Sequence, residues 1–219
     1  LESIEAYTFK NCSALQQVVL SDDITTIGQY SFQNCSALKE IHIPEGVTSI
    51  GNYAFKDCDN LAKVIIPLKL ANVGVQAFDN TKWYANLSVY EEAPTENKFH
   101  IYGDGVLIKA DIIDNTSIVI PENVKSLSGT FEGCESLTEI ELPSNLKYIG
   151  DCTFKNCTNL TEITIPEGVT VIGEEAFAGS GVTSIGKLAF ANCYRLTSIV
   201  IPDSVTGNWW ALTTSEGVI

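Results

Sequence analysis

Short stretches of alternating apolar and polar residues recur along the chain, and most of them end in a proline. In Ile41-His42-Ile43-Pro44, the two isoleucines share one face of a strand and His42 lies on the other, because side chains alternate along a strand. Pro44 has no N–H group and therefore ends the strand. The pattern predicts a short strand that buries its isoleucines and turns His42 outward.

The residues after each strand predict a turn, a second extended piece and one helical turn. Gly46 provides the turn, Val47 to Ile50 forms the extended piece, and Asn52 to Lys56 reads as a helical turn that carries Phe55 inward. The position before the cysteine column, in which Thr81 and Ser180 fill two places, is always Asn, Asp or Gly, and these residues tolerate the left-handed conformation that ends a short helix. These positions are Asn11, Asn34, Asp57, Asn80, Gly133, Asn156, Gly179 and Asn192.

These elements return every 23 residues, as the phenylalanines show most directly, except that Phe78 and Phe131 are 53 residues apart and Phe177 and Phe190 are 13 apart. The phenylalanine column consists of Phe9, Phe32, Phe55, Phe78, Phe131, Phe154, Phe177 and Phe190. Glycine, cysteine, leucine and proline columns keep the same period. A single repeat cannot bury its own apolar face, so the sequence predicts stacked repeats whose strands pair in parallel about 4.8 Å apart.

The segment Leu38-Lys39-Glu40-Ile41-His42-Ile43 resembles the strand signature of leucine-rich repeats, and the I-P, I-G, A-F and C columns resemble the BspA type in particular. The resemblance covers about 4–84 and 118–206. It implies a repeat solenoid, a right-handed coil with a parallel β-sheet face and with short strands and short helical turns on the other side. Such repeats often belong to large secreted or surface-anchored microbial proteins, and some are implicated in adhesion. The family has no catalytic residues to carry over.

Departures from the repeat predict four segments. Residues 1–84 form an N-terminal block that starts mid-repeat, 85–117 an insertion, 118–206 a C-terminal block and 207–219 a non-repeat tail. Alternating residues around Asp104-Gly105 predict a β-hairpin that interrupts the solenoid. Similar hairpins interrupt other family members, which favours a spacer. The tail is either a cap over the last coil or a segment without a fixed fold, and Trp209 and Trp210 favour the cap.

The charge balance narrows the class of partner. The chain has 27 acidic and 13 basic residues, a net charge of −14. A sequence-independent nucleic-acid binder or a binder of anionic lipids needs a basic surface, so both are disfavoured. The sequence contains no run of 18 apolar residues, so it predicts no membrane insertion. Because Leu1 is not an initiator Met, we expect a mature or trimmed form, or an excised fragment.

The seven cysteines favour packing over redox chemistry. Six of them occupy one column of the repeat, and stacked side chains about 4.8 Å apart are too distant for a disulfide, which needs Cβ atoms about 3.8 Å apart. Cys152 lies off the column and is expected to be more accessible. No C-x-x-C motif is present, so we predict no metal site.

Catalytic motifs are absent from the sequence. The two histidines, His42 and His100, lie on a strand and in the insertion, and no nucleophile elbow, zinc-protease motif or phosphate-binding loop occurs. Asp22-Asp23 is better explained as a solvated turn than as a calcium site. The sequence therefore predicts no enzyme, no catalytic residue, no metal and no cofactor.

The outward residues of the parallel sheet are the main candidate for binding a partner. Exposed valine and isoleucine in this column are unusual for a solvated face, although β-propensity alone is an alternative explanation. The candidate residues are Val19, His42, Ile65, Val119, Glu141, Thr164 and Val200. A secondary aromatic patch consists of Trp83, Tyr84 and Tyr102 beside the insertion.

The expected function is a non-catalytic, extracellular protein-recognition or adhesion module of a microbial surface protein. Its expected partner is a protein of a host, a matrix or a microbial surface. Two alternatives remain open. The chain could be a targeting or spacer domain of a larger secreted enzyme, or it could bind glycans through Trp83, Tyr84 and the hairpin.

Overall fold

The computed structural model describes residues 2–88, 96–113, 116–160, 163, 165–166 and 169–176, and the backbone of 213–214 and 217–218. The chain forms two compact units. Unit 1 contains residues 1–93 and 100–109, and unit 2 contains residues 94–99 and 110–219. Each unit is described by itself below.

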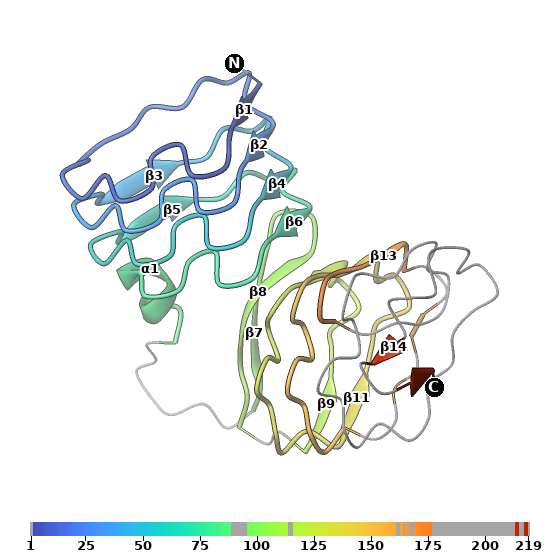
Figure 1. Cartoon of the computed structure of the whole chain (residues 1–219). Helices are drawn as coiled ribbons and strands as arrows, with labels where there is room; N and C mark the ends of the chain where they lie inside the picture. The colour runs from blue at the N-terminus through green and yellow to red at the C-terminus, as the bar shows by residue number, and fades with distance from the viewer. Residues whose placement is uncertain are drawn as a thin grey trace. The chain divides into compact units, whose positions relative to one another are not determined.

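Unit 1 is a β-solenoid whose coils are joined by two separate parallel sheets (Figure 1). One sheet has the order β1 (Ser3–Ile4), β2 (Thr26–Ile27), β4 (Ser49–Ile50) and β6 (Asn72–Val73), and each strand pairs with the residues 23 positions further on. The other sheet pairs β3 (Glu40–His42) with β5 (Lys63–Ile65). In β3, Ile41 is buried while Glu40 and His42 are exposed, which confirms the predicted alternation.

The helical turns expected after the second strand are absent from the coils that the structure describes. Each coil instead makes a run of hydrogen-bonded turns in which two residues have positive φ, for example Tyr53 (φ 59°) and Asp57 (φ 60°). A residue in the left-handed region cannot continue a right-handed helix. The left-handed position before the cysteine is confirmed in six coils, and the one helix within the described residues is α1 (Lys82–Asn86).

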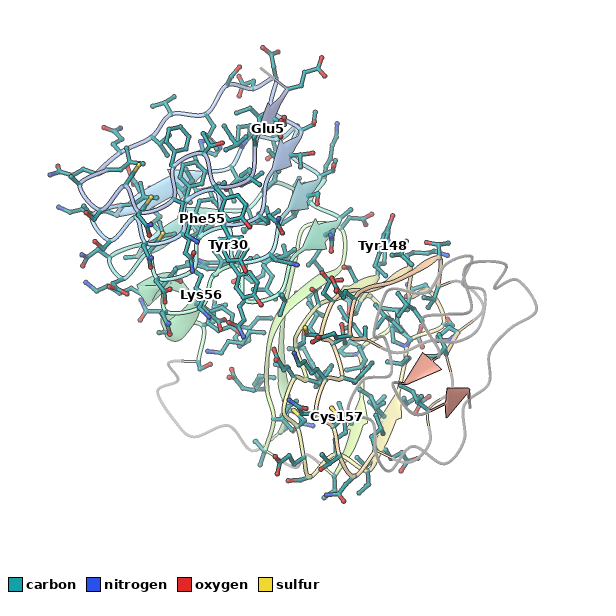
Figure 2. The ribbon with its side chains drawn as sticks, in the orientation of Figure 1. Glu5, Tyr30, Phe55, Lys56, Tyr148 and Cys157 are labelled. Atoms are coloured by element: carbon teal, nitrogen blue, oxygen red, sulfur yellow. The ribbon has the colours of Figure 1, made fainter. Side chains whose placement is uncertain are left out.

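The core of unit 1 is a ladder of stacked aromatic rings. Phe55, labelled in Figure 2, is fully buried and lies between Phe32 and Phe78, with ring centroids 5.1 and 5.3 Å away and nearly parallel planes. The column thiols link neighbouring coils, since Cys58 Sγ donates to Phe32 O at 3.1 Å. The six described cysteines are free thiols; five of them belong to the column, and Cys152 does not.

Glycine is required where the backbones of two coils meet. A Cβ added at Gly51 would lie 2.8 Å from the Cα of Gln29 in the preceding coil, closer than side chains approach backbone. The same glycine donates its N–H to Ile27 O at 2.7 Å. The I-G column of the sequence therefore records a close backbone contact between coils, which recurs at Gly28, Gly74, Gly150 and Gly173.

Unit 2 repeats the architecture of unit 1. One of its sheets pairs β9 (Ser117–Val119) with β11 (Glu139–Glu141), and the other joins β10 (Ser126–Leu127), β12 (Tyr148–Ile149) and β13 (Val171–Ile172) in parallel. In the tail, β14 (Thr213–Thr214) and β15 (Gly217–Val218) form an antiparallel pair. The tryptophans of the expected cap, Trp209 and Trp210, lie outside the described residues.

The predicted hairpin is present as β7 (Lys98–Tyr102) and β8 (Val106–Asp111), neighbouring strands joined by residues 103–105. Its tip closes against unit 1, because Asp104 N donates to Leu70 O at 2.7 Å. Val106 and Ile108 are buried in the core of unit 1. The repeat solenoid with parallel strands and an inserted hairpin is therefore confirmed, with little helix.

Candidate functional site

A groove of about 590 Å³ lies over the outward face of unit 1, along β3, β5 and the preceding segment Gln17–Leu20. Three of the residues predicted from the sequence line it together: Val19, His42 and Ile65. They come from three successive coils, 23 residues apart, because the outward position of each strand is repeated by the solenoid. The fold thus converts a periodic sequence position into a continuous surface.

The groove combines exposed apolar side chains with carboxylates. Val19 is 86% exposed and Ile65 is 41% exposed, and neither is covered by the rest of the described chain. Asp22, Glu40 and Glu45 supply the negative charge, and the basic residues that line the groove are one lysine and one histidine. Apolar side chains that remain in water in the folded protein can be buried by a partner, which is the physical source of most binding energy.

The one lysine of the groove is already paired. Lys63 Nζ lies 3.4 Å from Glu40 Oε2, and both side chains are more than half exposed, so water weakens their attraction. Glu45 accepts a hydrogen bond from the N–H of Leu68 at 3.2 Å, which fixes this carboxylate at the end of the groove. The site therefore has a net negative charge and a partly fixed geometry.

The remaining residues of the predicted binding column belong to unit 2. Val119 is 61% exposed on β9 and lies in register with Glu141 on β11, which is also exposed. Thr164 and Val200 lie outside the described residues. Whether this whole column binds one partner stays a prediction.

The predicted aromatic patch closes one end of the unit 1 core. The ring of Trp83 lies 4.9 Å from Phe78 in an edge-to-face contact and 5.6 Å from Tyr102. Lys109 Nζ lies 4.6 Å from the centroid of the Tyr84 ring and donates to Tyr84 O at 3.1 Å. Trp83, Tyr84 and Tyr102 are all half-buried. Much of their ring surface is engaged within the protein, and a ligand role for them stays a prediction.

A second aromatic ladder was missed by the sequence reasoning. Tyr7, Tyr30 and Tyr53 stack with centroid distances of 5.1 and 4.7 Å, all at positive φ. Lys10 Nζ lies 4.8 Å from the Tyr30 ring, and Lys56 Nζ lies 5.4 Å from the Tyr53 ring (Figure 2). Their 23-residue spacing was a usable signal. The ring faces are turned to one another, so the ladder stabilises coil stacking and does not present a flat aromatic platform.

The groove residues contributed by the turn after each strand were also missed. Asp22, Glu45 and Gly46 follow strands at positions that repeat as Asp-Asp or Glu-Gly, a pattern that reads as an ordinary turn. The sequence of such a turn predicts that it is exposed, but it does not predict that the turn lines a groove.

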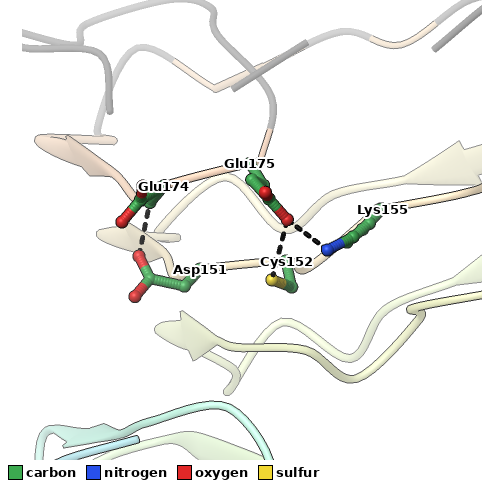
Figure 3. Close-up of polar contacts among 5 residues, drawn as sticks. All are labelled: Asp151, Cys152, Lys155, Glu174 and Glu175. Carbon is green, nitrogen blue, oxygen red and sulfur yellow. Dashed lines mark hydrogen bonds and ion pairs between the residues drawn. The ribbon is translucent and has the colours of Figure 1, made fainter. Parts of the chain in front are cut away.

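The off-column Cys152 belongs to a polar cluster in unit 2 (Figure 3). Its Sγ lies 3.7 Å from Glu175 Oε2, and Glu175 also pairs with Lys155. Burial, with the carboxylate of Glu132 adding to it, raises the pKa of Cys152 to about 11. The hydrogen bond to Glu175 raises the pKa of Lys155. A thiol held protonated is a poor nucleophile, so the cluster is an inter-coil contact.

Within the described part of the chain, no group of three or more His, Cys, Asp or Glu side chains is arranged to hold a metal ion. No helix there has the length and apolar character needed to cross a bilayer.

The repeat columns match the model of the BspA type leucine rich repeat region, in 6 copies over residues 1–98 and 110–207. The chain belongs to this family. No curated protein matched the chain.

Solved structures with a similar fold are bacterial leucine-rich repeat proteins. A T. pallidum leucine rich repeat protein is 24% identical, with 90% of this chain and 72% of that chain covered and a TM-score of 0.42. A leucine-rich repeat protein from Bacteroides ovatus is 26% identical, with 94% and 54% covered and a TM-score of 0.39. A leucine rich cell surface protein from Faecalibacterium prausnitzii is 24% identical, with 100% and 81% covered and a TM-score of 0.38.

Proposed function

We propose that this chain is a non-catalytic protein-recognition or adhesion module at a microbial cell surface, and that it binds a protein partner through the groove of unit 1. The observation that carries the proposal is the exposure of Val19 and Ile65 in one groove of about 590 Å³ on a sheet face. Solenoids commonly bind partners along such extended faces.

Family membership supports the proposal at a coarser level, because leucine-rich repeats are typically non-catalytic binding modules. The surface location is supported by the printed description of the Faecalibacterium prausnitzii protein as a cell surface protein. The simpler explanation of the exposed residues is the high β-propensity of valine and isoleucine. That explanation accounts for the residue types on each strand but not for the carboxylates of Asp22, Glu40 and Glu45 that line the same groove.

The test begins with selection of binders from a displayed library of extracellular-matrix and bacterial-surface protein fragments. Enriched fragments are then measured against Ile65→Arg and against the control Val171→Arg. Val171 is 40% exposed, as Ile65 is 41% exposed, and it lies on β13 of unit 2 outside the groove lining, so both variants add the same charge at an equally exposed apolar strand residue. We expect Ile65→Arg to weaken binding at least about tenfold and Val171→Arg to leave it unchanged.

Circular dichroism spectra of both variants provide the folding control. Equal effects of the two variants would refute the groove as the binding surface. Failure to enrich any fragment would count against protein recognition itself.

A further inference from the structure

The backbone ladder that joins the coils of unit 1 is interrupted beside the groove. Before the gap, Ala37 N donates to Ser13 O at 3.2 Å, and after it Thr48 N donates to Thr25 O at 3.0 Å. Between these two bonds, no hydrogen bond among the described residues joins Gln17–Leu20 to β3. β3 is therefore an edge strand, and its sheet contains β5 as its other strand.

The open edge of β3 presents specific backbone groups. Ile43 N donates to Ile65 O at 3.1 Å, which shows that the odd-numbered residues of this segment direct their backbone N–H and C=O groups toward β5. Consecutive residues of a strand direct their N–H and C=O groups to opposite edges. Glu40 and His42 thus direct theirs toward Gln17–Leu20, where both residues are exposed and line the groove. Unpaired groups of this kind form a template for another strand.

We propose that β3 accepts an extended, basic peptide segment of the protein partner as an added strand. The inference rests on the proposed function and specifies how the partner binds. In strand addition, main-chain hydrogen bonds provide affinity, and alternate side chains of the added strand provide specificity. Here the main-chain partners are the N–H and C=O groups of Glu40 and His42, and the exposed side chains of Val19 and His42 flank the added strand.

The charge of the groove identifies the chemistry of the occupant. Asp22, Glu40 and Glu45 line it, and Lys63 is already paired with Glu40 at 3.4 Å. A second copy of this chain, with its net charge of −14, would bring like charge to the site. Lysine or arginine side chains on the outward face of the added strand match the carboxylates, and β-branched residues at the alternate positions favour the extended conformation.

The test uses the full chain and synthetic peptides of about nine residues, a common strand length. One peptide alternates lysine with valine and another alternates glutamate with valine. Two further lysine–valine peptides carry N-methyl groups, one on every valine amide and the other on every lysine amide. Fluorescence anisotropy measures binding, and hydrogen exchange follows the amides of Glu40 and His42.

Strand addition predicts a specific asymmetry among these peptides. Only alternate amides of an added strand face β3, so one N-methylated peptide is expected to bind at least about tenfold more weakly than the parent while the other binds like it. The glutamate peptide is expected not to bind. Exchange at Glu40 and His42 is expected to be fast in the free protein and slowed by the parent peptide. Equal tolerance or equal loss of the two methylated peptides would overturn the proposal.

Charge variants separate this inference from the proposed function. Asp22→Lys lies in the groove, whereas Asp59→Lys makes the same charge change at an exposed residue of unit 1 outside it. We expect Asp22→Lys to weaken binding of the lysine–valine peptide severalfold more than Asp59→Lys does. Equal effects would overturn the basic occupant.

If Glu40 and His42 amides are already protected in the free protein, the first coil itself closes on β3 and strand addition is wrong. If the Ile65→Arg test succeeds with selected partners while both methylated peptides bind like the parent, the groove binds side chains and only this inference fails. If neither the Ile65→Arg variant nor either methylated peptide shows weakened binding, the proposed function fails as well.

Discussion

The phenylalanine ladder makes a quantitative prediction about how stability depends on position along the solenoid. Phe55 is fully buried and stacks on Phe32 and Phe78 at 5.1 and 5.3 Å. Replacing a buried phenylalanine by alanine costs about 3–5 kcal/mol, because the side chain leaves a cavity that neighbours fill only in part. A ring with partners on both faces belongs at the upper end of that range, so we expect Phe55→Ala to cost about 4–5 kcal/mol.

Phe9 provides the matched comparison. It stacks on Phe32 at 5.0 Å, but it is only half-buried, so its truncation removes less buried apolar surface. We expect Phe9→Ala to cost about 2 kcal/mol, roughly half the loss at Phe55. Phe55→Leu keeps most of the volume and is expected to cost about 1 kcal/mol.

Urea unfolding in a background where Trp209 and Trp210 are replaced by phenylalanine measures these differences in unit 1. The remaining tryptophan, Trp83, lies 4.9 Å from Phe78 and reports the unfolding of that unit. Far-UV circular dichroism on the same samples shows whether the two units unfold together. If Phe9→Ala and Phe55→Ala lower the free energy of unfolding equally, the argument that burial and stacking on both faces set the cost is refuted.

Three further predictions follow from the same packing. Gly51→Ala is expected to cost several kcal/mol or prevent folding in denaturation experiments, because its Cβ would overlap the backbone of the preceding coil. Gly133→Asn should cost only about 0.5 kcal/mol, because the site has open space and Asn tolerates the left-handed conformation that its φ of 74° requires. Alkylation of the native protein at pH 8, followed by mass spectrometry, should label exposed Cys12 first. Cys152, with its pKa raised to about 11, should react slowly at pH 8 and faster as the pH rises, and early labelling of Cys152 would contradict this. Tyr30→Gly relieves a positive φ of 56° but removes both ring contacts, so thermal unfolding should show a net loss of about 1–2 kcal/mol, and a gain would show that strain outweighs stacking.

The fold was predictable because each column of the repeat performs one task in every coil. The isoleucines of the strand are buried, proline follows the strand, and glycine lies where backbones meet. Each 23-residue repeat therefore gives the same structural prediction, and the repeats support one another. The helical turn was mispredicted because Tyr53 occupies a left-handed position that bulky residues rarely adopt. The stacking of that ring on Tyr30 at 4.7 Å is a contact between coils, and a single repeat does not reveal it.

The candidate site was predictable only in part. Strand alternation predicts Val19, His42 and Ile65 on one outward face, and in the structure they line one groove. The open edge of β3 had no sequence signal, since Gln17-Val18-Val19-Leu20 has the same alternation as the strands that do pair. Whether two adjacent segments form their ladder depends on how the coils diverge, which is a tertiary property.

The regularity of the repeat itself limits where a binding function can lie. The residues that repeat in register make their contacts inside the solenoid: phenylalanine rings face one another, the Cys58 thiol donates to a carbonyl, and backbone groups pair from coil to coil. The outward strand position is different, because any residue that is compatible with a β-strand can occupy it without disturbing the fold. In the described coils it holds valine, histidine, isoleucine, valine and glutamate. Residues at this position can vary while the backbone stays the same, so the surface can acquire specificity without a loss of stability. In the described part of unit 1, this surface lies beside the interval in which no backbone hydrogen bonds join the first two coils.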